Sequence, residues 1–92
     1  MVMLISYDLN KHERPSAYAA VEKMIKDTVG QSNYIKALYS QWLVDTTSSA
    51  STWSEKMKTV TDEDDLWLIV PLKGGHSGWL NSNVVDWLDG RV

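Results

Sequence analysis

Apolar and polar residues along this chain follow patterns that distinguish strands from helices. The opening segment, Met1–Asn10, places alternate side chains on opposite faces of an extended strand: Val2, Leu4 and Ser6 on one face, and Met3, Ile5 and Tyr7 on the other. Because both faces are largely apolar, we predict a central strand that is covered on both sides. Asp8 would then lie where this strand leaves the sheet.

A helical pattern follows a short polar connector. Pro15 suits a first helical turn, and Gly30 suits the position just after a helix. The apolar residues between them recur at helical spacing: Ala17, Val21, Met24, Ile25, Thr28 and Val29. We therefore predict a helix from about Pro15 to Val29.

The segment from Tyr34 to Thr46 favours strand, but its alternation changes phase partway. Ile35, Ala37 and Tyr39 share one parity, whereas Trp42 and Val44 take the other. A shift of one residue turns every following side chain to the opposite face. We therefore expect two short strands, with a tight turn or a bulge at Ser40–Gln41.

The rest of the chain predicts a second helix, a last strand and a structured tail. Trp53, Met57 and Val60 have helical spacing, and Thr52 and Glu55 have the spacing of a capping box, with Ser51 as another possible N-cap. Residues 66–72 (LWLIVPL) favour a strand that ends at Pro71 or lies at a sheet edge. In the tail, residues 83–88 predict one or two helical turns, capped by Asn83 and ended by Gly90.

This order predicts an α+β fold, the ferredoxin-like βαββαβ plait, in which two helices cover one face of an antiparallel sheet. Residues 1–72 would form the core, and residues 73–92 a C-terminal extension of the same domain. The other sheet face would be bare, yet the first and last strands are apolar on both sides. We expect the C-terminal tail, a partner protomer or both to cover it, and we favour a homodimer.

Composition narrows the possible functions. The chain has 92 residues, which indicates one domain, and it has no cysteine, which excludes disulfides and thiolate chemistry. Its net charge is −3, with one net positive charge up to Val44 and four net negative charges after it, so it is not a generally basic nucleic-acid binder. No segment approaches the roughly 20 apolar residues of a membrane span, and the start lacks signal-peptide features. We expect a cytoplasmic protein without membrane contact.

The candidate chemistry gathers after the first strand. Asp8 is either a ligand of a hard cation such as Mg²⁺ or a turn-forming carboxylate. Tyr7 and Asn10 flank it and could hydrogen-bond a phosphate or a metal-bound water, or simply pack at the strand end. Lys11 and Arg14 could contact a nucleic-acid backbone or stay in a solvated loop. The acidic run Asp62–Asp65 lacks calcium-loop spacing and is expected to be a solvated turn.

The chain resembles the small CRISPR-associated endoribonucleases, whose better-known role is as the dimeric partner of the spacer integrase. The resemblance covers residues 2–72. Its motifs are Tyr7-Asp8-Leu9, the helix that follows, Ser40-Gln41-Trp42, and the acidic turn Asp62–Asp65 leading to Pro71-Leu72. Gln41 and Trp42 replace the family's usual aliphatic residue and Phe. The virulence-associated protein D toxins are a more distant resemblance with the same plan.

The resemblance implies a symmetric dimer with Asp8 of each subunit near the cleft, where it helps to bind a divalent metal. Active members of the family use that metal for phosphodiester hydrolysis, and others are nuclease-silent DNA scaffolds. Two hypotheses follow. The first is a divergent relative that cleaves RNA or DNA with Mg²⁺ or Mn²⁺ at paired Asp8. The second is a non-catalytic homodimeric module that binds protein or nucleic acid, and the acidic composition favours it. Whether the chain is an enzyme stays open at this point.

Overall fold

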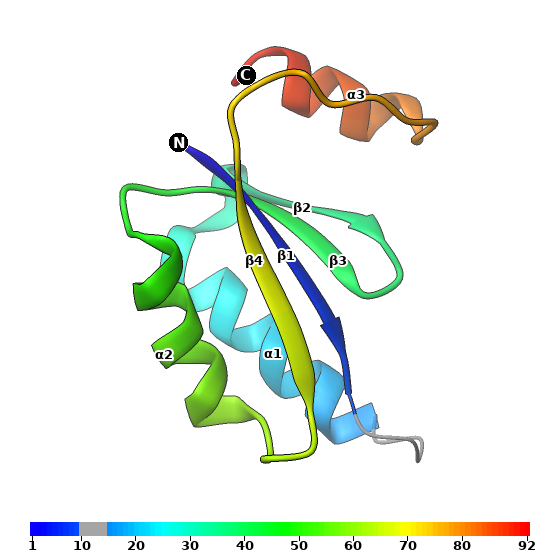
Figure 1. The fold of residues 1–92 in the computed structure, drawn as a ribbon. Helices are drawn as coiled ribbons and strands as arrows, with labels where there is room; N and C mark the ends of the chain where they lie inside the picture. Colours follow the sequence, from blue (N-terminus) through cyan, green and yellow to red (C-terminus); the bar gives the residue numbers. More distant parts are fainter. Residues whose placement is uncertain (10–14) are drawn as a thin grey trace.

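The computed structural model of the chain describes residues 1–9 and 15–92. The elements follow in the order β1 (Val2–Asp8), α1 (Pro15–Val29), a 3-10 turn (Gln31–Asn33), β2 (Tyr34–Leu38), β3 (Gln41–Asp45), α2 (Ala50–Val60), β4 (Leu66–Leu72) and α3 (Ser82–Asp89) (Figure 1). The predicted α+β class and βαββαβ order are confirmed, and the tail adds the helix α3.

The four strands form one antiparallel sheet in the order β2-β3-β1-β4, which is consistent with the ferredoxin-like plait. β1 lies between β3 and β4, as its two apolar faces predict. β4 pairs with β1 along its whole length and lies at the edge of the sheet. An edge strand tolerates Pro71, which has no N–H to donate to a neighbouring strand.

The main core lies between the sheet and the pair α1 and α2, which cover the same face (Figure 1). Side chains that are fully buried come from each of these layers: Ile5, Val21, Ile25, Val44, Trp53 and Met57. Burying one large apolar side chain stabilises a fold by about 1.5–3 kcal/mol. This cluster therefore fixes the position of β1, and with it the end of the strand where Asp8 lies.

The β2–β3 connection explains the change of phase in the sequence. The turn falls at Tyr39–Ser40, and the register of the two strands shifts between Lys36 and Leu38. The two predicted strands are confirmed, but the turn lies one residue earlier than the predicted Ser40–Gln41, because Gln41 already belongs to β3; a bulge within β2 accompanies it. The backbone N–H of Tyr7 donates to the Ser40 carbonyl at 3.1 Å, which brings this turn to the end of β1.

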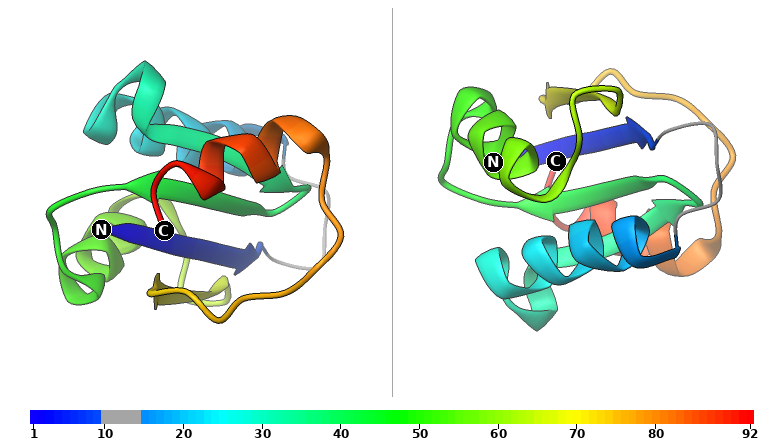
Figure 2. Two further views of the ribbon diagram at one scale, coloured as in Figure 1. Left: turned by 90° about the horizontal axis from the view of Figure 1, so that it is seen from above. Right: turned by 90° about the horizontal axis from the view of Figure 1, so that it is seen from below.

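The tail covers one end of the second sheet face. Val84 and Leu88 of α3 pack against Val2 and Leu43 in a separate buried cluster. Seen from above, α3 runs along β2 and β3, with its C-terminal end nearer the N-terminus (Figure 2). The predicted cover by the tail is therefore confirmed for this part of the face.

Arg91 holds the end of this tail in place. Its Nε lies 3.1 Å from Asp45 Oδ2, and its Nη2 donates to the Ser32 carbonyl at 2.6 Å. The guanidinium also stacks on the Trp87 ring at 4.2 Å, and the Trp87 indole N–H donates to the same Ser32 carbonyl at 3.2 Å. These contacts tie the C-terminus to β3 and to the turn before β2.

Candidate functional site

Asp8 is the last residue of β1 and its side chain is exposed. It pairs with Leu66 in the register of β1 and β4, and the preceding pair on the same face is Ser6 with Leu68. Side chains alternate along a strand, so Asp8 faces the same side as Ser6, which is the side that α3 partly covers. The carboxylate therefore stands at the end of the second sheet face that lies away from α3.

Tyr7 points to the opposite side, into the main core, where it is 4% exposed. Its hydroxyl accepts a hydrogen bond from the indole N–H of Trp42 at 2.9 Å. Burial raises the pKa of Tyr7 to about 12, so the phenol stays protonated at neutral pH. The structure thus places Tyr7 in a structural contact between β1 and β3, on the face away from Asp8.

An aromatic row extends from Tyr7 toward the surface. The Tyr7 and Tyr18 ring centroids are 5.9 Å apart, and those of Tyr18 and Tyr39 are 5.7 Å apart. The other predicted site residues, Asn10, Lys11 and Arg14, lie outside the described residues. Their predicted contacts with a phosphate or a nucleic-acid backbone stay predictions.

The described part of the chain contains no ready-made group of metal-ligating side chains. Among residues 1–9 and 15–92, no three His, Cys, Asp or Glu side chains are grouped so that they could hold an ion. Mg²⁺ is commonly held by one or two carboxylates, with waters and phosphate oxygens as its other ligands. A site built on Asp8 would take its other ligands from waters, a substrate phosphate or a second carboxylate.

The acidic turn before β4 is more ordered than predicted. Asp65 is 4% exposed, its Oδ2 accepts the Asp62 N–H at 2.7 Å, and the Asp62 carbonyl accepts the Asp65 N–H at 3.1 Å. The prediction of a solvated turn is therefore wrong for Asp65. The Asp65 carboxylate closes the turn that leads into β4, so one of the four acidic residues in Asp62–Asp65 stabilises the fold.

Sequence reasoning missed a groove on the second sheet face. It has a volume of about 500 Å³ and lies between the β2–β3 turn, the β-strands and the tail. Its lining is mostly apolar and comes from three parts of the chain: Leu4, Ala37, Leu38, Leu43, Leu72, Trp79, Leu80, Val85 and Leu88, with Gln41, His76, Ser77, Gly78 and Asp89 at the remaining positions. The feature of the sequence that could have indicated this groove is Trp79, a large aromatic residue in a glycine-rich segment.

The tryptophans differ in how deeply they are buried. Trp42 and Trp53 are buried, and the half-buried Trp67 packs against the main core. Trp87 is half-buried beneath Arg91, whereas Trp79 is 98% exposed. Among the described residues, no helix is both long enough and apolar enough to cross a membrane.

Comparisons of this chain with protein-family models, with curated proteins and with solved structures gave no match.

Proposed function

We propose that this chain works as a homodimer whose interface is the part of the second sheet face that α3 leaves uncovered. In this proposal, the Asp8 carboxylates of the two copies meet in one cleft and hold Mg²⁺ or Mn²⁺ for phosphodiester hydrolysis in RNA or DNA. The observation that supports it is the position of Asp8, an exposed carboxylate on the same face as exposed leucines. We also propose a cytoplasmic location.

The uncovered area has the character of an interface. Leu66 and Leu68 of β4 are 66% and 65% exposed, and Leu38 at the end of β2 is 52% exposed. All three lie on one sheet face: Leu66 and Leu68 form a leucine patch on the edge strand β4, and Leu38 lies on the opposite edge strand, with Gln41 and Ser6 between it and Leu68. A domain of this size buries only roughly 60–65% of its unfolded surface by itself, and association adds burial. A second copy would supply it.

The symmetry of a dimer would complete the acidic site. In a two-fold interface, each residue near the axis lies close to its own counterpart. Asp8 borders the leucine patch through its pairing with Leu66, so an axis through this end of the sheet would bring two carboxylates together. Two carboxylates, waters and substrate phosphate oxygens make a suitable ligand set for Mg²⁺ or Mn²⁺.

The division of tasks in such a site follows from the fold. A cation bound there would activate a water that attacks phosphorus, and it would stabilise the charge that develops as the phosphorus–oxygen bond to the leaving group breaks. Asp8 would hold the cation, and the buried residues of β1 would hold Asp8 in place. The resemblance to the CRISPR-associated endoribonucleases implies the same use of this aspartate, and we propose that the chain is a divergent relative of that family.

The test is a cleavage assay with single-stranded RNA, single-stranded DNA and double-stranded DNA, with and without Mg²⁺ or Mn²⁺. Asp8→Asn should abolish cleavage while it leaves the dimer and its stability within about 0.5 kcal/mol of the wild type, because the side chain is exposed. Asp86→Asn, an exposed aspartate on α3, is the matched control and should cleave normally. Unchanged cleavage by Asp8→Asn would show that the site is elsewhere.

A second function is a non-catalytic homodimeric module that binds protein or nucleic acid. It is favoured by the acidic composition, with a net charge of −3, and by the single candidate carboxylate at Asp8. In that case, the folded dimer would cleave none of the three substrates with either metal. The same assay therefore separates the two functions.

A further inference from the structure

We infer that Tyr39, Lys36 and Lys26 form a surface that binds single-stranded nucleic acid. Tyr39 would stack on a base, and the two lysines would contact backbone phosphates. The inference rests on the proposed action on RNA or DNA and deepens it, because it names the form of the substrate and the residues that hold it. A base and a phosphate occur in RNA and DNA alike, so the surface would bind single strands of either.

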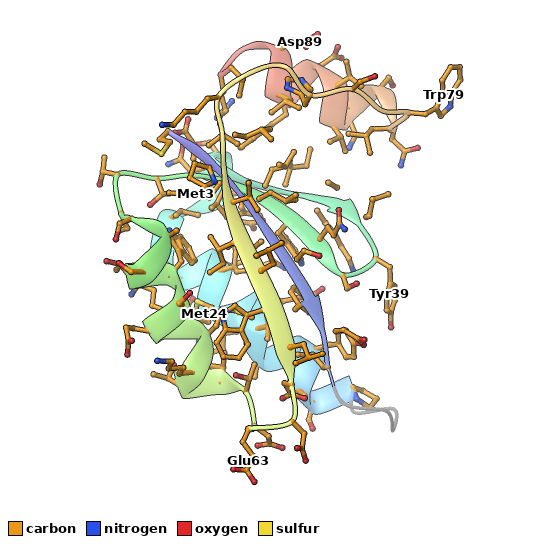
Figure 3. The ribbon with its side chains drawn as sticks, in the orientation of Figure 1. Met3, Met24, Tyr39, Glu63, Trp79 and Asp89 are labelled. Carbon is orange, nitrogen blue, oxygen red and sulfur yellow. The ribbon has the colours of Figure 1, made fainter. Side chains whose placement is uncertain are left out.

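Tyr39 is a surface ring that is supported by the aromatic row from the core. It is 74% exposed and projects from the β2–β3 turn (Figure 3). Its ring packs on Tyr18 at a centroid distance of 5.7 Å, and Tyr18 packs on the buried Tyr7 at 5.9 Å. Both distances are typical of favourable aromatic pairs. The Tyr39 ring is therefore held in position before any ligand arrives, which lowers the entropy cost of binding a base.

Two lysines continue this surface along β2 and α1. The Lys36 Nζ lies 5.2 Å from the centroid of the Tyr39 ring and 5.9 Å from that of Trp42. The Lys26 Nζ lies 6.0 Å from the Trp42 centroid and 5.9 Å from that of Tyr34. Cationic and aromatic side chains placed next to one another are typical of surfaces that bind single strands.

The charges at this surface favour a polyanion, although the whole chain carries a net charge of −3. Lys36 pairs with Glu22 at 3.4 Å, and both side chains are partly exposed, so a phosphate could replace the carboxylate at little cost. The adjacent Lys23 and Asp27 pair with each other at 2.6 Å. Within the described ranges, 1–9 and 15–92, no carboxylate forms an ion pair with Lys26. Lys26, Lys36 and Glu22 together leave one net positive charge.

The position of the surface fits a substrate that reaches the proposed catalytic carboxylate. The Tyr7 backbone N–H donates to the Ser40 carbonyl at 3.1 Å, so the turn that carries Tyr39 adjoins the end of β1, where Asp8 lies. A nucleotide stacked on Tyr39 would bring its neighbouring phosphates toward this end of the strand. Bases in a duplex are stacked on one another, whereas a single strand can offer a free base to an aromatic side chain.

Fluorescence anisotropy tests the role of Tyr39. The ligands are labelled single strands of about 12 nucleotides, RNA and DNA, and the matching DNA duplex, all in EDTA to prevent metal-dependent cleavage. We expect the wild type to prefer both single strands to the duplex. Tyr39→Ala should weaken single-strand binding at least about fivefold, and Tyr39→Phe, which keeps the ring, should stay within about twofold. Trp79→Ala is the matched control, because it removes another exposed ring, and it should bind as the wild type does.

The salt dependence of binding tests the lysines. Each phosphate contact with a single strand contributes about 0.7 to the slope of log K against log salt concentration. Lys26→Gln should therefore weaken binding and reduce this slope by about 0.7. Lys58→Gln is the matched control, because Lys58 is exposed on α2 and pairs with Glu55 at 3.1 Å, and it should leave the slope unchanged.

The outcomes for this surface and for the proposed nuclease are distinguishable. A wild type that binds neither single strand, or a Tyr39→Ala protein that binds both as tightly as the wild type, would overturn the inference, whatever the cleavage assay shows. Asp8→Asn should bind single strands as the wild type does and fail to cleave them. Binding that depends on Tyr39, in a protein that cleaves nothing, would support the surface and refute the nuclease.

Discussion

The hydrogen bond between Tyr7 and Trp42 supports the sheet next to Asp8, and Tyr7→Phe tests its contribution to stability. The substitution removes only the hydroxyl that accepts the Trp42 indole N–H at 2.9 Å. Trp42 is 3% exposed, so its N–H would lose its partner where water has little access. A buried polar group left without a partner costs about 1–3 kcal/mol.

For a domain of this size, 1 kcal/mol shifts the melting temperature by about 4–8 °C, so we expect a decrease on the order of 10 °C. Urea unfolding followed by tryptophan fluorescence would give the free energy directly. Tyr39→Phe is the matched control, because this tyrosine is 74% exposed and its loss should stay within about 0.5 kcal/mol. A Tyr7→Phe protein as stable as the wild type would show that the hydrogen bond does not stabilise the fold.

Two further predictions concern the same framework. Because burial raises the folded-state pKa of Tyr7 to about 12, against an unfolded value near 10, the unfolded chain releases this proton first as the pH rises. The free energy that Tyr7 contributes to folding should therefore be fully present below pH ~10 and decrease by roughly 1.4 kcal/mol per pH unit between about 10 and 12. The unfolding free energies of the wild type and Tyr7→Phe, measured at alkaline pH, should converge over this range. A constant difference between them would contradict the pKa assigned to Tyr7. Arg91→Ala should release α3 at a cost of about 1 kcal/mol, and the amides of residues 82–89 should then exchange faster. Arg91→Lys should not restore their protection, because lysine lacks the planar group that stacks on Trp87. Unchanged exchange in Arg91→Ala would show that Arg91 does not hold the tail.

Most of the fold could be predicted because the spacing of the apolar residues and the residues that begin or end an element indicate the same helices and strands. α1 begins at Pro15 and ends at Val29, and Gly30 takes the positive φ of 80° that favours glycine after a helix. β4 spans Leu66–Leu72 as predicted, and the parity change near residue 40 marks a turn.

Helix starts were predicted less well, since several residues that can cap a helix stand close together. The N-cap of α2 is Ser49, whose side chain accepts the Thr52 N–H at 3.2 Å, so the prediction of Thr52 or Ser51 is wrong. Similarly, α3 begins at Ser82, which places Asn83 inside the helix rather than at its cap. Serine, threonine and asparagine all favour the N-cap position, so a segment that holds several of them does not indicate at which one the helix begins.

Only the part of the site that lies on β1 could be predicted from the sequence. Alternation along β1 separates Tyr7 from Asp8, and the exposed position of Asp8 follows from its place at the strand end. The groove beside Trp79 joins β1, the β2–β3 turn and the tail, so it depends on contacts between distant segments that local patterns do not reveal. The second Asp8 that the proposed metal site requires would come from another molecule.

The central claim is that the uncovered end of the second sheet face joins two copies of the chain. The most direct measurement is the mass in solution of the wild type and of Leu68→Glu, which places a charge on that face at a residue already 65% exposed. The proposal predicts a wild type at twice the 10.4 kDa of the chain and a folded, monomeric Leu68→Glu. A monomeric wild type, or a Leu68→Glu dimer as tight as the wild type, would contradict it.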